Sequence, residues 1–135
     1  MSPNTWRPPS SDRGKELLRT VALVHGMFYA VTGFWPIISI STFQLVTGPK
    51  RDLWLVRTVG ALLTVIGGVL TLAGLRRRVT PEILLLGVGS ALGLTTIDLV
   101  YYRRGVLGPV FLLDAVAELG LASGWVLALR LHTPR

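Results

Sequence analysis

The sequence predicts an all-α, polytopic membrane protein in which four transmembrane helices form an antiparallel bundle. Half of the 135 residues are apolar and only 16% are charged, whereas about 25% are charged in an ordinary soluble domain. The apolar residues gather in four long runs, and about 20 apolar residues are enough for a helix to cross a bilayer core of about 30 Å. The segments between the runs are short, so consecutive helices are expected to be antiparallel neighbours.

The chain is expected to fold as one transmembrane domain over residues 17–131, between two polar tails. Residues 1–16 are polar and rich in proline, and we expect a flexible cytoplasmic tail there. Residues 132–135 form a short C-terminal tail. The four membrane spans are expected at about 17–40, 53–75, 82–102 and 106–131.

Local signals mark the ends of these spans. Pro36 suits the exit of the first helix. Before the third span, Thr80 is a candidate N-cap and Pro81 would occupy the first helical position. Between the first two spans, apolar residues suit a segment that lies along the membrane surface: Phe43, Leu45 and Val46.

The basic residues predict the orientation. Nine of the 14 lie on the side of the membrane that holds both termini: Arg7, Arg13, Lys15, Arg19, Arg76, Arg77, Arg78, Arg130 and Arg135. Basic residues favour the cytoplasmic side, so we expect a multi-pass protein of the cell membrane with both termini in the cytoplasm. The net charge of +7 is expected to contact anionic lipid rather than nucleic acid, because no basic patch is interleaved with aromatic residues.

The sequence contains no pattern that requires a cofactor or a metal. There is no cysteine, which excludes disulfides, thiolate metal sites and thiol chemistry within the chain. The two histidines, His25 and His132, are too few and too far apart for a metal motif. The glycines are not arranged as a phosphate-binding loop.

Five ionisable residues fall inside the spans: His25, Arg57, Asp98, Asp114 and Glu118. Each costs about 2.5–3.5 kcal/mol to insert, so each needs a partner or a wet cavity. With a rise of about 1.5 Å per residue, Arg57 and Asp98 both lie roughly 6 Å below the outer boundary of the bilayer core. This common depth predicts a structural ion pair.

The other ionisable residues predict a polar site inside the bundle. Asp114 and Glu118 are four residues apart and share one helix face, as do His25 and Tyr29. His25 and Glu118 also lie at the same estimated depth, so these four residues form a candidate ligand-binding or proton site. Glu118 is the expected functional carboxylate because it lies nearer the bilayer centre. The alternative is that these groups only hold the helices together.

Small residues recur at the four-residue spacing that permits close helix packing. They are Ala22, Gly26 and Ala30; Gly60, Thr64 and Gly68; Gly89 and Gly93; and Gly120 and Gly124. The pattern fits packing within one bundle or in a homo-oligomer.

Three stretches resemble a family of small uncharacterised four-helix bacterial membrane proteins. They are HGMFYAVTGFWP from His25, VTGPKRDLWLVRT from Val46 and RRGVLGPVFLLDAVAE from Arg103. The resemblance covers nearly the whole chain. It implies a four-helix membrane fold and no activity that can be named.

Three functions are compatible with these features. The first is a non-enzymatic binding or accessory protein for a lipophilic small molecule or a membrane complex, which the glycine-rich helix faces favour. The second is a small proton-coupled transporter that works as a homo-oligomer, which the paired carboxylates favour. The third is an intramembrane enzyme on a lipid-like substrate, with His25 and Glu118 as acid and base. It ranks last because no nucleophile or metal set accompanies the pair.

Overall fold

The computed structural model describes residues 9–49 and 52–132, and every regular element in this part of the chain is a helix. Four of the helices are long and apolar enough to cross a membrane, which confirms the all-α, four-span prediction. The fifth, α2, is a short helix in the linker between the first two spans. In chain order the helices are α1 (Pro9–Ile38), α2 (Ile40–Thr47), α3 (Leu53–Leu75), α4 (Pro81–Arg103) and α5 (Val110–His132).

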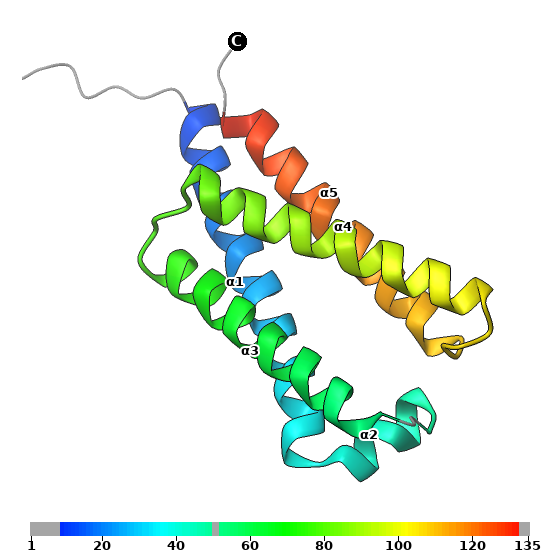
Figure 1. The fold of residues 1–135 in the computed structure, drawn as a ribbon. Helices are drawn as coiled ribbons and strands as arrows, with labels where there is room; N and C mark the ends of the chain where they lie inside the picture. The colour runs from blue at the N-terminus through cyan, green and yellow to red at the C-terminus, as the bar shows by residue number, and fades with distance from the viewer. Residues whose placement is uncertain (1–8, 50–51, 133–135) are drawn as a thin grey trace, which may run out of the picture.

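The long helices form two antiparallel hairpins that meet at one end and diverge at the other (Figure 1). In the first hairpin α1 packs along α3, and in the second α4 packs along α5. The two hairpins are joined mainly by α1 against α5, whereas α3 and α4 have little contact. The start of α1 and the end of α5 lie together at the closed end (Figure 1). At the opposite end the long helices of the two hairpins stand apart, and α2 lies against the start of α5, where a Cβ on Gly108 would lie 3.9 Å from the carbonyl oxygen of Thr47.

Glycines allow α1 and α3 to approach closely. A Cβ built on Gly67 of α3 would lie 2.5 Å from the backbone nitrogen of Ala30 and 2.6 Å from the carbonyl oxygen of Gly26. A Cβ on Gly33 would lie 2.5 Å from the carbonyl oxygen of Gly60. Both contacts lie at the α1–α3 interface. The contacting glycines are therefore seven residues apart in each helix, at Gly26 and Gly33 in α1 and at Gly60 and Gly67 in α3.

This spacing corrects part of the predicted packing. Gly26 and Gly60 do pack as expected. Four other glycines of the four-residue patterns have open space where a Cβ would be: Gly68, Gly89, Gly93 and Gly120. These four therefore make no close helix contact within the described part of the chain.

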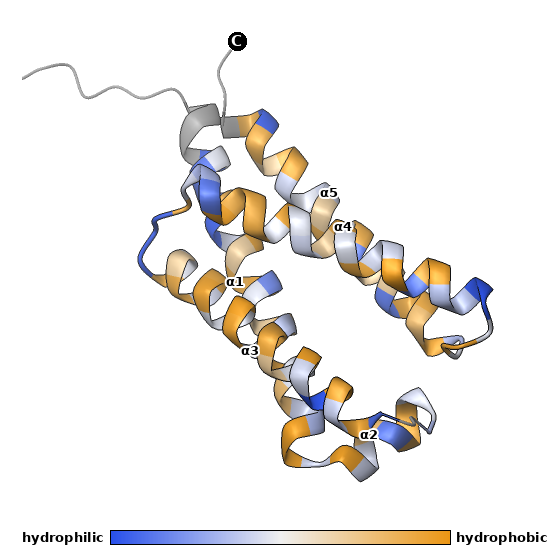
Figure 2. Cartoon of the chain, viewed as in Figure 1, coloured by the Kyte–Doolittle hydropathy of each residue, from blue (hydrophilic) through white to orange (hydrophobic). Residues whose placement is uncertain are grey.

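The distribution of polarity is that of a membrane protein (Figure 2). Large apolar side chains cover the outside of the helices; Leu85 is 73% exposed and Leu113 is 72% exposed. Polar side chains lie inside, where His25, Glu118 and Asp98 are buried. An apolar surface of this extent is unfavourable in water and favourable against lipid.

The helix boundaries differ from the prediction at two places. Residues 9–16, expected in the flexible tail, are helical and belong to α1. The fourth span begins at Val110 instead of 106. Gly105, with φ 73°, ends α4, and Val106 donates its N–H to the carbonyl oxygen of Tyr101 at 2.9 Å. The rest of the predicted tails, residues 1–8 and 133–135, lies outside the described residues, as do Lys50 and Arg51.

The predicted start of the third span is confirmed. The hydroxyl of Thr80 accepts a hydrogen bond from the backbone N–H of Ile83 at 3.3 Å, with Pro81 at the first helical position. The apolar linker is the helix α2, in which Leu45 and Val46 are exposed, whereas Phe43 packs edge-on against Trp35. A position of this helix along the membrane surface stays a prediction. The indole N–H of Trp35 ties α2 to α1 by donating to the hydroxyl of Thr42 at 2.9 Å.

Candidate functional site

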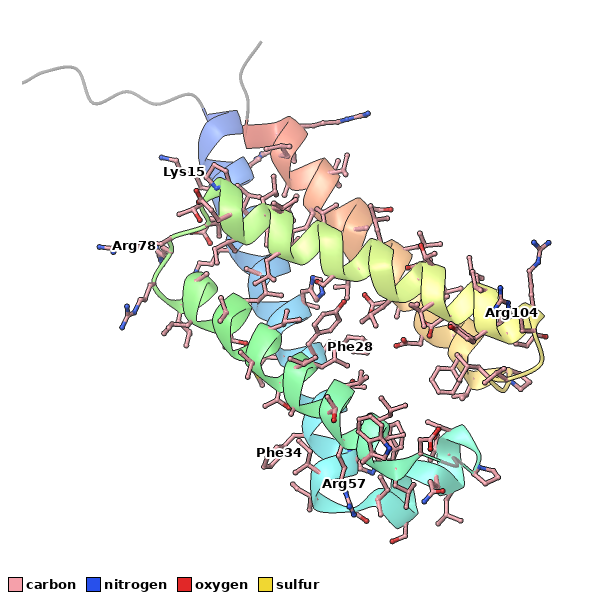
Figure 3. The ribbon with its side chains drawn as sticks, viewed as in Figure 1. Lys15, Phe28, Phe34, Arg57, Arg78 and Arg104 are labelled. Carbon is pink, nitrogen blue, oxygen red and sulfur yellow. The ribbon has the colours of Figure 1, made fainter. Side chains whose placement is uncertain are left out.

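A cavity of about 830 Å³ lies between the two hairpins on the side where they diverge. This volume falls in the range of about 300–1,000 Å³ that is typical of small-molecule sites. Its walls are mostly apolar and include the aromatic rings of Phe28, Phe43 and Phe111; Phe28 points into the space between the hairpins (Figure 3). At the closed end, a core cluster fills the bundle: Leu18, Val21, Ala22, Leu70, Trp125 and Ala128.

A chain of buried polar contacts runs from this core to the cavity. The indole N–H of Trp125 donates to Nδ1 of His25 at 3.0 Å. The ring of His25 packs edge-on against Tyr29, with ring centroids 4.2 Å apart. The hydroxyl of Tyr29 donates to Oε2 of Glu118 at 2.7 Å. Two hydrogen bonds in this series of contacts therefore connect α5 to α1, one from Trp125 to His25 and one from Tyr29 to Glu118.

A glycine makes room for the indole in this chain. A Cβ on Gly87 of α4 would lie 2.6 Å from the ring of Trp125. Trp125 is fully buried, so α4 can pack over it only where the side chain is absent. Gly87 thus determines how deeply Trp125 sits between α1 and α4.

The hydrogen bond from Trp125 defines the form of His25. A nitrogen that accepts a hydrogen bond carries no proton, so His25 is neutral and its proton is on Nε2. Nε2 is buried and has no hydrogen-bond partner among the described residues. His25 does not line the cavity. Its contacts make it a residue that positions Tyr29.

Three carboxylates line the cavity: Asp98 from α4, and Asp114 and Glu118 from α5. Asp98 is 4% exposed and Glu118 is 1% exposed, whereas Asp114 is partly exposed. Asp114 lies beside Asp98 and close enough to Glu118 and Tyr29 to interact with them electrostatically. Oδ2 of Asp98 is buried and has no hydrogen-bond partner within residues 9–49 and 52–132.

The predicted ion pair between Arg57 and Asp98 is not formed. Arg57 is exposed, and its side chain points away from α4 and α5 (Figure 3). Among the described residues, the ion pairs join Glu16 to Arg19 at 4.0 Å and Glu16 to Arg77 at 3.8 Å. The prediction used a common depth in the bilayer, but α3 pairs with α1 rather than α4, so Arg57 and Asp98 lie on different hairpins.

The other predicted site residues meet as expected, with two additions. His25, Tyr29 and Glu118 form one contact chain, and Asp114 lines the same cavity. Trp125, which is not among the predicted site residues, donates a hydrogen bond to His25.

The second addition is Asp98, and the sequence contains a signal that could have found it. Asp98 and Asp114 stand eight residues before and after Val106, which lies in the α4–α5 turn. Residues equidistant from the turn of an antiparallel hairpin lie at the same level. Asp98 and Asp114 therefore lie at the same height along the α4–α5 hairpin, because each is eight residues from its turn.

The carboxylates do not form a metal site. No group of three or more His, Asp or Glu side chains in residues 9–49 and 52–132 has a geometry that could hold a metal ion. The arrangement is an apolar chamber with several oxygen acceptors on the wall formed by α4 and α5. It can surround an apolar molecule and bind a polar or charged group of that molecule.

Comparison with known proteins adds no relative to this picture, and the resemblance drawn from the three sequence stretches stays a prediction. No protein-family model, no curated protein and no solved structure matches the chain.

Proposed function

We propose that this protein binds a lipophilic small molecule in the cavity between its two helix hairpins. The observation that carries the proposal is the cavity of about 830 Å³, with apolar walls and the acidic residues at its inner side. A bundle that served only to pack four helices would bring α3 against α4 and fill this space. Instead the two hairpins diverge.

A ligand that dissolves in the bilayer could reach this cavity directly. The cavity is lined by both α3 and α4, through residues such as Val59 and Leu94, and these two helices have little contact. A lipophilic molecule in the membrane could therefore enter between them. With both termini in the cytoplasm, as the basic residues favour, the cavity would open toward the outer side of the cell membrane.

Two adjacent residues of α5 provide a matched test. Ala117 lines the cavity, whereas Val116 is 68% exposed on the outer surface. Ala117→Phe should fill part of the cavity, and Val116→Phe should add the same ring against lipid. Binding of the neutral lipophilic probe N-phenyl-1-naphthylamine can be measured by equilibrium dialysis with protein in lipid nanodiscs and empty nanodiscs as blank.

We expect Ala117→Phe to weaken binding about tenfold, equivalent to about 1.4 kcal/mol, and Val116→Phe to leave it within about twofold. Equal binding by both variants would contradict a binding role for the cavity. That result would favour an accessory subunit in a membrane complex.

A proton-coupled transporter, acting as a homo-oligomer, is the second candidate. The observation that favours it is the set of three carboxylates beside a cavity that opens at one end, since such groups in a membrane can exchange a proton for a ligand. Purified protein in liposomes should then accumulate the probe only when a pH gradient is imposed. Accumulation that does not depend on the gradient would exclude this function.

The arrangement favours an intramembrane enzyme least. Nδ1 of His25 is occupied by Trp125, and His25 does not line the cavity. A catalytic base must reach the proton that it removes, and a ligand in the cavity would meet Tyr29 and Glu118 instead.

A further inference from the structure

The acidic side of the cavity has no compensating positive charge in the described part of the chain. Asp98, Asp114 and Glu118 form none of the ion pairs found there, which are made by Glu16 with Arg19 and Arg77. The hydroxyl of Tyr29 satisfies only one oxygen of Glu118. Burying a charge without a partner is strongly unfavourable, so this cluster calls for a cation supplied from outside the chain.

One oxygen marks where that cation would bind. Asp98 is 96% buried and lines the cavity, yet its Oδ2 has no hydrogen-bond partner in the part of the chain that the structure describes. A buried acceptor in this position normally has a donor. The neighbouring Asp114 is another acid, so even a proton shared between the two carboxyl groups leaves the pair with a negative charge.

We infer that the ligand is a drug-sized lipophilic amine in its protonated form, whose ammonium group binds Asp98 and Asp114 while its apolar body occupies the cavity. The inference rests on the proposed function and names the ligand class of the same site. An ammonium N–H supplies both the donor and the positive charge that Asp98 lacks.

The walls of the cavity fit the rest of such a ligand. Phe28 and Phe111 provide apolar surface for a hydrophobic body, and aromatic faces also attract a cation. An anion would meet three carboxylates, which disfavours it. A bare metal ion would find no convergent set of ligands among the described residues and would leave the apolar walls unused.

The test compares an amine with a neutral molecule of the same shape. Protein in nanodiscs is titrated at pH 7 with 4-phenylbenzylamine, which is charged, and with 4-phenylbenzyl alcohol, which is not. The variants are Asp98→Asn, which keeps the shape of the side chain but removes its charge, and Glu82→Gln, which removes an exposed acid from the other end of α4.

We expect the wild type to bind the amine about tenfold more tightly than the alcohol, equivalent to about 1.4 kcal/mol. Asp98→Asn should reduce this preference to about twofold or less, because loss of the charge weakens binding of the amine more than binding of the alcohol. Glu82→Gln should keep the full preference.

The outcomes separate the inference from the proposed function. If the wild type binds both molecules equally, or if folded Asp98→Asn keeps the preference, the cavity binds lipophiles but the amine assignment is wrong. If the wild type binds neither, the proposed function fails as well. The wild-type comparison decides the inference even if Asp98→Asn does not fold.

Discussion

The adjacent residues Gly67 and Gly68 of α3 give the most direct test of the helix packing. A Cβ at Gly67 would lie 2.5 Å from the backbone nitrogen of Ala30, whereas ordinary contact begins at about 3.4 Å. In Gly67→Ala, α1 and α3 must therefore separate by about 0.9 Å. A Cβ at Gly68 has no neighbour within 4 Å, so Gly68→Ala is the matched control on the same helix.

The two variants differ in one energetic contribution. Alanine favours a helix over glycine by about 0.8–1 kcal/mol, and this gain applies equally to both positions. Overpacking at a close contact costs about 1–3 kcal/mol, and it applies only to Gly67. The free energy of unfolding of Gly67→Ala should therefore be about 1–3 kcal/mol below that of Gly68→Ala, toward the larger value because backbone atoms cannot move aside.

The assay is unfolding in mixed micelles with increasing sodium dodecyl sulfate, followed by the fluorescence of the four tryptophans. The wild type should unfold between the two variants, about 0.8–1 kcal/mol below Gly68→Ala. If Gly67→Ala resists the detergent as well as Gly68→Ala, the close approach of α1 and α3 is refuted.

Three further predictions concern other parts of the chain. Arg57→Leu should change the free energy of unfolding by less than about 0.5 kcal/mol, because the side chain is exposed; a loss above about 2 kcal/mol in the same titration would reinstate the ion pair expected from depth. Trp125→Phe removes the donor to buried Nδ1 of His25 and should cost about 1–3 kcal/mol, so an unchanged unfolding curve would argue against this hydrogen bond. Cysteines introduced at Ser10 or Thr133 of this cysteine-free chain should not react with an impermeant thiol reagent in intact cells, and labelling of either would reverse the proposed orientation.

The sequence by itself determined the membrane class and the positions of the spans. α3 matches the expected residues 53–75, and α4 differs from 82–102 by one residue at each end. These features are local: a bilayer requires about 20 apolar residues in a helix, and such runs can be read without knowing which helices meet. The prediction missed the helical residues 9–16 of α1, and it missed the α4–α5 turn, where the cause was also local because Gly105, with φ 73°, ends α4.

Most residues of the candidate site could also be predicted from the sequence. Tyr29 follows His25 by four residues, and Glu118 follows Asp114 by four, so each pair shares a helix face. Estimated depth placed His25 level with Glu118, and the structure joins them through Tyr29. Depth along the bilayer is a single coordinate, however, and it says nothing about which helices are neighbours.

The pairing of the helices depends on tertiary contacts, and the positions of Arg57 and Asp98 follow from it. Because α1 packs on α3, and α4 on α5, Arg57 faces away from the acids and Asp98 joins Asp114. Contact along a pair of helices recurs every seven residues in α3, at Gly60 and Gly67, and a four-residue glycine motif does not specify it. The cavity exists because the long helices of the two hairpins diverge from the end where α1 packs on α5, and that depends on how side chains distant in sequence fit together.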